Sequence, residues 1–189
     1  VLLNSCDKKK ACLLDIFFDS IYNLKINLIE RSKMKAQVLH KYDPEMKEAV
    51  WVTGEELPNP KIEKASDVIV KIGAAGVCRT DLHIIEGVWK HITDQNNDLL
   101  PMVMGHENAG WVEDIGKDVE GFKKGDAVIL HPKVSGTGGT CLDCRRGNDM
   151  HAENPIFAGL NVKHGGYSEL LQTSVRNLIK IPKVLGPID

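Results

Sequence analysis

A cysteine and a histidine–glutamate pair are the residues of this sequence best suited, by type and setting, to holding a metal ion. Cys78 follows a Val/Ile-rich run and the small residues 73–76, and it opens a short helical pattern over 79–83. Backbone N–H groups at such a strand-to-helix turn favour the metal-binding thiolate. His106 and Glu107 follow a glycine further along the chain. A thiolate, an imidazole and a carboxylate together suit zinc, and an incomplete protein shell leaves a position for water or substrate.

Asp81 is a candidate for the outer shell of this site. Its carboxylate would accept the second ring proton of His106 and so fix the tautomer of that ligand. Each residue also has a plain structural alternative, because Cys78 could be a small buried thiol, His106 a loop residue and Asp81 a solvent-facing residue of a helix. The metal hypothesis therefore depends on these residues occurring together.

A second group of sulfur ligands is the Cys-x-x-Cys formed by Cys141 and Cys144. The chain has five cysteines, an odd number, and the other three are scattered. This distribution does not fit a disulfide scaffold and favours a reduced, cytoplasmic setting with metal-binding or redox cysteines. The glycine cluster at 136–140 leads into this pair and lacks the third glycine of a G-x-G-x-x-G dinucleotide-binding turn.

Length and composition restrict the class of protein. With 189 residues the chain has room for one domain and little more. Its 24 basic and 26 acidic residues give a net charge of −2, which provides no broad positive field, so we expect no nucleic-acid partner. No segment reaches the roughly 18 uninterrupted apolar residues of a membrane span, so we expect no membrane association.

The elements that would position these ligands are mainly β-strands. From Met34 onward, short Val- and Ile-rich runs alternate with Gly, Pro, Asn and Asp turns, as in a small sandwich or barrel. Helical signals are few, the clearest over Arg79 to Glu86 and a shorter one after Cys141. Before Met34, residues 11–29 have the spacing of an amphipathic helix, and we interpret residues 1–33 as an extension, either translated upstream sequence or poorly ordered.

Four segments, in one order and spacing, resemble the zinc-dependent medium-chain alcohol dehydrogenases. The resemblance runs from about Met34 to Pro182. The four segments are GAAGVCRTDLH (73–83), GHENAGWVEDIG (105–116), FKKGDAVI (122–129) and TCLDCRRGNDMHAEN (140–154).

The resemblance implies a fold and a chemistry. The fold would be mainly β, a GroES-like partly open β-barrel over residues 34–189, with a few short helices and a lobe of the structural-zinc type. Cys78, His106 and in some relatives Glu107 would bind one catalytic Zn²⁺. In this family the metal acts as a Lewis acid on an alcohol oxygen while a hydride passes to NAD or NADP.

The resemblance also implies roles for the neighbours of these ligands. Thr80 would accept the alcohol proton and pass it, through the cofactor ribose, to His83 on the same helical face. Arg79 would face the cofactor pyrophosphate. Trp89 and Val134 would border the pocket for a small alcohol or aldehyde.

The sequence departs from the family pattern in the lobe. Of four positions that usually carry structural-zinc ligands, Cys141 and Cys144 are kept, whereas Gly138 and Ala152 offer no donor. His151 could substitute after a one-residue shift, and Asp149 or Glu153 could contribute an oxygen. We therefore expect a degenerate structural site.

A second departure is length, because full-length relatives continue into a Rossmann cofactor domain. We expect that domain to be absent here, so NAD or NADP would bind only if it is supplied, and the chain alone would be a truncated, inactive catalytic domain. A homo-oligomer or the missing domain would be its protein partner. The alternative is a non-catalytic GroES-like module that binds a partner or metal. The zinc-free quinone and enoyl reductases are disfavoured, since they generally lack the Cys and Gly-His-Glu set.

Overall fold

The computed structural model describes residues 32–135, 139–182 and 185. The helix expected over residues 11–29 lies outside these residues. The first strand, β1, begins at Lys33, one residue before the expected start of the domain.

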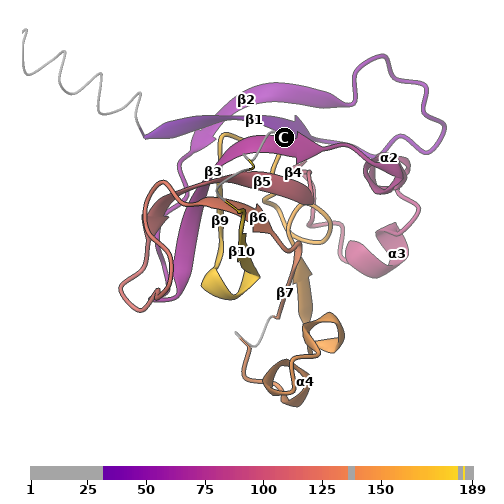
Figure 1. The fold of residues 1–189 in the computed structure, drawn as a ribbon. Coiled ribbons are helices and arrows are strands. Elements are labelled where there is room, and N and C mark those ends of the chain that lie inside the picture. Colours follow the sequence, from indigo (N-terminus) through magenta and orange to yellow (C-terminus); the bar gives the residue numbers. More distant parts are fainter. Residues whose placement is uncertain (1–31, 136–138, 183–184, 186–189) are drawn as a thin grey trace, which may run out of the picture.

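A five-stranded antiparallel sheet forms the centre of the molecule (Figure 1). Two of its middle strands, 67–76 and 127–130, are rich in Val and Ile, as expected for strands that are buried on one face or both. In spatial order the strands are β10 (Leu178–Lys180), β6 (Ala127–Leu130), β5 (Glu107–Ile115), β3 (Asp67–Gly76) and β9 (Leu170–Ser174).

A second, three-stranded sheet lies beside the first. Its order is β2 (Val52–Pro58), β1 (Lys33–Leu39) and β4 (Met102–Val103). An isolated bridge joins Ala36 of β1 to Ser168, two residues before β9. The two sheets do not close into a continuous barrel in the described part of the chain. The expectation of a mainly β, partly open architecture is therefore confirmed.

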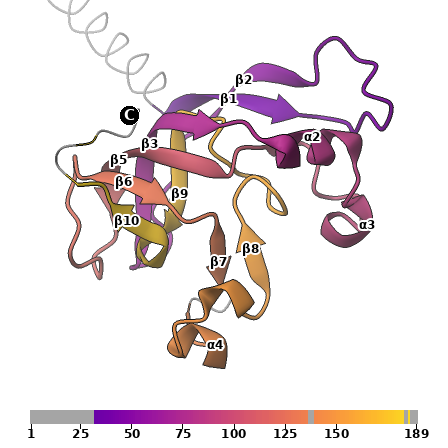
Figure 2. The ribbon, with the colours of Figure 1, turned by 45° about the vertical axis from the view of Figure 1, so that its right-hand side comes forward.

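Short helices and a projecting hairpin complete the structure. The helices α2 (Arg79–Glu86) and α3 (Lys90–Thr93) lie at one end of the sheets (Figures 1 and 2). The lobe, as we call the part that projects from the body in both views, consists of β7 (Lys133–Ser135), α4 (Leu142–Arg145), η1 (Asp149–His151) and β8 (Pro155–Phe157). The 3-10 helix η2 (Val175–Asn177) joins β9 to β10. No helix in the described ranges has the length and apolar character needed to cross a membrane.

Three apolar clusters lie in the described part of the body, and the two larger ones position the site. The larger one lies on the five-stranded sheet and consists of Val68, Val70, Val112, Val128, Leu130, Ala158, Leu171 and Leu178. The other packs α2 against β1 and the segment that leads into β5, and it consists of Leu39, Ile84, Ile85, Leu99, Met102 and Met104. The second cluster fixes the helix that follows Cys78 against the strand region that precedes His106.

We expect Leu171→Ala to destabilise the chain by about 2–5 kcal/mol, because it removes a fully buried side chain and leaves a cavity. Leu171 is 2% exposed. The matched control is Leu142→Ala, at a leucine that is 57% exposed, which should change stability by less than about 0.5 kcal/mol. Urea unfolding of the metal-free protein, followed by circular dichroism, measures both, and equal midpoints would contradict this assignment of the core.

Candidate metal centre

The ladder between β3 and β5 brings the two strongest candidate ligands together. Gly76 at the end of β3 pairs with Glu107 at the start of β5, so Cys78, two residues beyond, and His106, one residue before, meet at the same end of the sheet. The Cys78 Sγ lies 3.1 Å from the His106 Nε2. A sulfur and an imidazole nitrogen that are 28 positions apart in sequence thus converge on one point.

Asp81 completes the cluster from the first turn of α2. It is 2% exposed. Its Oδ2 accepts a hydrogen bond from the Cys78 backbone N–H at 3.0 Å, which satisfies a donor at the start of the helix. Its Oδ1 lies 3.5 Å from the His106 Nδ1. Among the described residues, Cys78, Asp81 and His106 form the one group of three or more such donors that could hold a metal ion.

The buried donors fit a metal cation. Neither the Asp81 Oδ1 nor the His106 Nδ1 makes a hydrogen bond of normal geometry with another described group. The Asp81 side chain and then the Cys78 sulfur stabilise a positive charge on His106, and they raise the pKa of its imidazole to about 9. Burial opposes the charged form of Asp81, yet His106 and the Cys78 N–H hold the pKa of this carboxyl below its usual value. This environment, with one sulfur and one imidazole donor, suits zinc.

Tyr167 fixes both ligand-bearing segments. Its hydroxyl donates to the Gly76 carbonyl at 3.1 Å, just before Cys78. Its ring lies against Gly105, where an added Cβ would come within 2.7 Å of the ring. Gly105 has a φ of +96°, a conformation that side-chain-bearing residues rarely adopt. The backbone before His106 is therefore shaped by this glycine and by the tyrosine packed on it.

Glu107 lies at the edge of the cluster. Its side chain is exposed, and its Oε2 would be 2.4 Å from a Cβ placed on Gly76. It does not belong to the group of converging donors formed by the other three residues. Its role as a ligand stays a prediction.

The other predicted residues lie on or beside α2. Thr80 and His83 are both half-buried on this helix. The His83 Nδ1 lies 2.8 Å from the Glu86 Oε2, and its ring makes an edge contact with Trp89, with the centroids 5.4 Å apart. Arg79 is 68% exposed at its side chain and lies 3.6 Å from Glu86.

Comparison with known proteins identifies the family to which this chain belongs. The alcohol dehydrogenase GroES-like domain model matches residues 64–183. The chain belongs to this family. The match contains Cys78, Asp81 and His106, and it extends through the lobe.

Similar proteins are dehydrogenases of about twice the length. The chain is 38% identical over 149 residues to the NAD-dependent alcohol dehydrogenase of Sulfolobus acidocaldarius, covering 78% of this chain and 40% of that protein. It is 36% identical over 158 residues to the D-arabinose 1-dehydrogenase (NADP(+)) of Saccharolobus solfataricus, covering 83% and 41%. The alcohol dehydrogenase structure from Aeropyrum pernix matches with a TM-score of 0.71 and 45% identity, covering 82% and 41%. The chain thus spans about two fifths of these relatives.

The lobe contains Val134 and the Cys-x-x-Cys pair. Val134 lies in β7 and pairs with Ile156 of β8. Cys141 and Cys144 flank the start of α4 and pack with Ala152 in a small buried cluster. Gly138 lies outside the described residues.

The candidates for rescuing the structural site do not gather around these thiols. His151 and Glu153 are exposed, and Asp149 pairs with Arg176 at 2.7 Å. Within the described part of the lobe, no group of three donors converges.

Sequence reasoning missed Tyr167 and Glu86. The contact of Glu86 with His83 could have been predicted, because Glu86 follows His83 by three positions on a predicted helix. The role of Tyr167 could not, since this residue lies about 60 positions from His106 and its hydroxyl contacts a backbone carbonyl.

We expect Tyr167→Phe to weaken zinc binding about 10-fold, the range for outer-shell partners of a ligand, because it frees the Gly76 carbonyl beside Cys78. The control is Tyr42→Phe, which also removes a single hydroxyl contact, here to the Asp94 Oδ2 at 2.8 Å. Competition with a chromophoric chelator measures both affinities. Equal zinc affinity in the two variants would show that Tyr167 does not position the site.

Proposed function

We propose that this chain supplies the zinc-binding catalytic part of an NAD(P)-dependent alcohol dehydrogenase, which oxidises an alcohol to an aldehyde or ketone. The observation that carries the proposal is the convergence of Cys78, Asp81 and His106 within the segment that matches the alcohol dehydrogenase GroES-like domain. The named relatives act with NAD or NADP, which supports the cofactor class.

In this proposal Cys78 and His106 hold the zinc through Sγ and Nε2, the two atoms that face one another, and Glu107 is a further candidate ligand. Asp81 orients His106 from the Nδ1 side. When bound, zinc would supply a Lewis acid for the substrate oxygen. The ligands from this chain number fewer than four, so a position for substrate remains.

In this proposal, side chains of α2 remove the proton of the alcohol. The Thr80 hydroxyl would take up the alcohol proton as it gives up its own, and His83 would carry the released proton towards solvent. Glu86 binds the His83 Nδ1, so the Nε2 is the nitrogen that is left to exchange a proton. Arg79 faces outward at the start of this helix, where it would bind the cofactor pyrophosphate. Trp89, in edge contact with His83, and Val134 would border the alcohol pocket.

Zinc content tests the first part of this proposal. We expect the full chain to bind one zinc and Cys78→Ser to bind it at least about 10-fold more weakly, because the thiolate ligand is lost. Co²⁺ in place of zinc should give a thiolate charge-transfer band that disappears in Cys78→Ser. The matched control, Cys144→Ser, should keep both the metal and the band. Unchanged metal binding in Cys78→Ser would refute the proposed site.

Hydride transfer tests the second part. The zinc-loaded chain, with and without an added cofactor domain, is mixed with simple alcohols and NAD⁺ or NADP⁺, and reduced cofactor is followed by absorbance. We expect activity when the domain is added and a loss of at least about 100-fold in Thr80→Val, the usual contribution of a group that transfers a proton. Thr53→Val, on β2, is the control. Zinc binding without activity in any arm would favour a non-catalytic module.

A further inference from the structure

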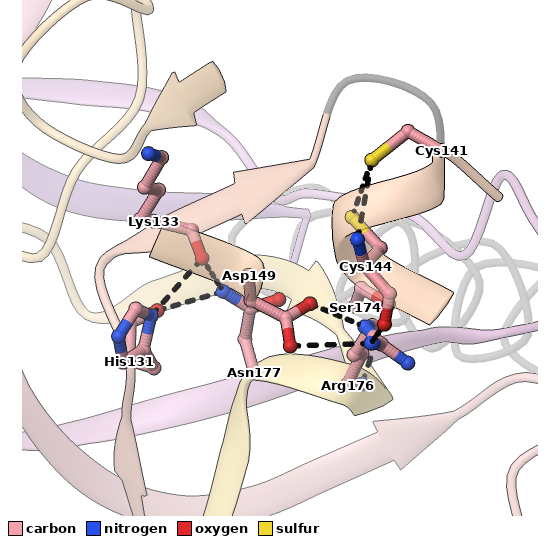
Figure 3. A network of polar contacts seen from close by, with 8 residues as sticks. All are labelled: His131, Lys133, Cys141, Cys144, Asp149, Ser174, Arg176 and Asn177. Atoms are coloured by element: carbon pink, nitrogen blue, oxygen red, sulfur yellow. Dashed lines mark hydrogen bonds and ion pairs between the residues drawn. The ribbon is translucent and has the colours of Figure 1, made fainter. Parts of the chain in front are cut away.

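The lobe contains two thiols in contact that the proposed reaction does not use. The Cys141 Sγ donates to the Cys144 Sγ across 2.8 Å. The backbone N–H of Cys144 also donates to the Cys141 Sγ at 3.4 Å. Figure 3 shows the two sulfur atoms facing one another at the start of α4. This geometry brings the sulfurs close enough for a bond to form between them without a large movement of the backbone.

The surroundings of the pair favour a bond between the sulfurs over a shared metal ion. A stable protein site for zinc needs four ligands in a closed structural site, or three in an open one. The Ala152 methyl packs on the two cysteines, and the Asp149 carboxylate is held by Arg176. The described part of the lobe therefore brings two donors together and no third.

A fixed cation lies beside the pair. The Arg176 Nη2 donates to the Cys144 carbonyl at 2.6 Å, and its Nε donates to the Asp149 Oδ1 at 2.7 Å (Figure 3). The guanidinium thus lies against the backbone of α4, where a positive charge favours the thiolate form of a neighbouring cysteine. It also ties α4 and η1 to η2, which keeps the two sulfurs in place while one of them reacts.

We propose that Cys141 and Cys144 form a reversible disulfide by exchange with a small-molecule disulfide. The Cys141 thiolate attacks one sulfur of the small disulfide, forms a mixed disulfide and releases the other half as a thiol. The Cys144 thiolate then attacks the Cys141 sulfur, closes the protein disulfide and releases the second thiol. The protein loses two electrons and two protons, and the small disulfide gains both.

The two cysteines have different roles in this exchange. Cys141 is 8% exposed and Cys144 is 2% exposed, so the external disulfide reaches Cys141 first. The N–H of Cys144 donates to the Cys141 Sγ, so it stabilises the Cys141 thiolate once the proton that Cys141 donates to Cys144 has left. Cys144, the more deeply buried residue, then resolves the mixed disulfide.

Peptide mass spectrometry tests the proposal, because trypsin releases Cys141 and Cys144 together in fragment 134–145 and Cys78 separately in fragment 72–79. The full chain is equilibrated in buffers from reduced to oxidised glutathione, acid-quenched and alkylated. We expect fragment 134–145 to change from doubly alkylated to unalkylated and two hydrogens lighter, and to revert on reduction. A fragment that stays doubly alkylated in oxidised glutathione, or that links to another fragment, would overturn the proposal.

Two variants test the order of attack. Cys144→Ser should accumulate one glutathione on Cys141, because no resolving thiol remains, whereas Cys141→Ser should gain several-fold less on Cys144. Equal adducts in both variants would overturn the assigned roles. Circular dichroism checks that each variant folds.

A control with added zinc distinguishes disulfide formation from zinc binding by the two lobe thiols. In Cys78→Ser, added zinc should leave the alkylation of fragment 134–145 unchanged. Protection of that fragment by zinc would show that the lobe thiols bind metal instead, and would overturn the proposal.

Discussion

The candidate site depends on one constraint, the register of β3 against β5. Because Gly76 lies opposite Glu107, the ends of two central strands deliver Cys78 and His106 to the same place. A shift of one residue would turn the side chains of one strand to the opposite face of the sheet, and would move these ligands apart as well. The hydrogen bonds that build the sheet are thus the same ones that assemble the donors.

Asp81 contacts both ligand-bearing segments and sets the charge around His106. One carboxylate oxygen receives the N–H of Cys78 at the start of α2, and the other faces His106. A buried carboxylate is costly unless partners compensate for its lost hydration. Asp81 therefore stabilises the helix start and the imidazole together, so a change at this residue would disturb both ligands at once.

Local pattern was enough to predict the elements that lie in longer patterned runs. The Val- and Ile-rich runs and their turn residues indicated β1, β2, β3, β5, β6 and β9, and also β10, whose three residues lie within the run 177–181. The 79–86 pattern indicated α2, and a shorter one indicated α4. The strands β4, β7 and β8 have two or three residues each, too few to show an alternating pattern, and their pairing is set by tertiary contacts.

The candidate site was likewise predictable from the sequence only in part. The types and setting of Cys78, His106 and Glu107 predicted metal ligands, because soft and borderline donors are recognisable in a sequence. Asp81 was predicted only as the partner of His106, and the structure brings it into the group of converging donors in place of Glu107. The part played by Tyr167 arises from its packing on Gly105, which only the folded chain reveals. The lobe is separate from this assembly: its thiols form a small buried cluster of their own with Ala152, and Asn177 anchors its base through the carbonyls of His131 and Lys133 (Figure 3). Since polar contacts from η2 hold the lobe, sulfur chemistry there can change while the β3–β5 ladder keeps the candidate metal donors in place.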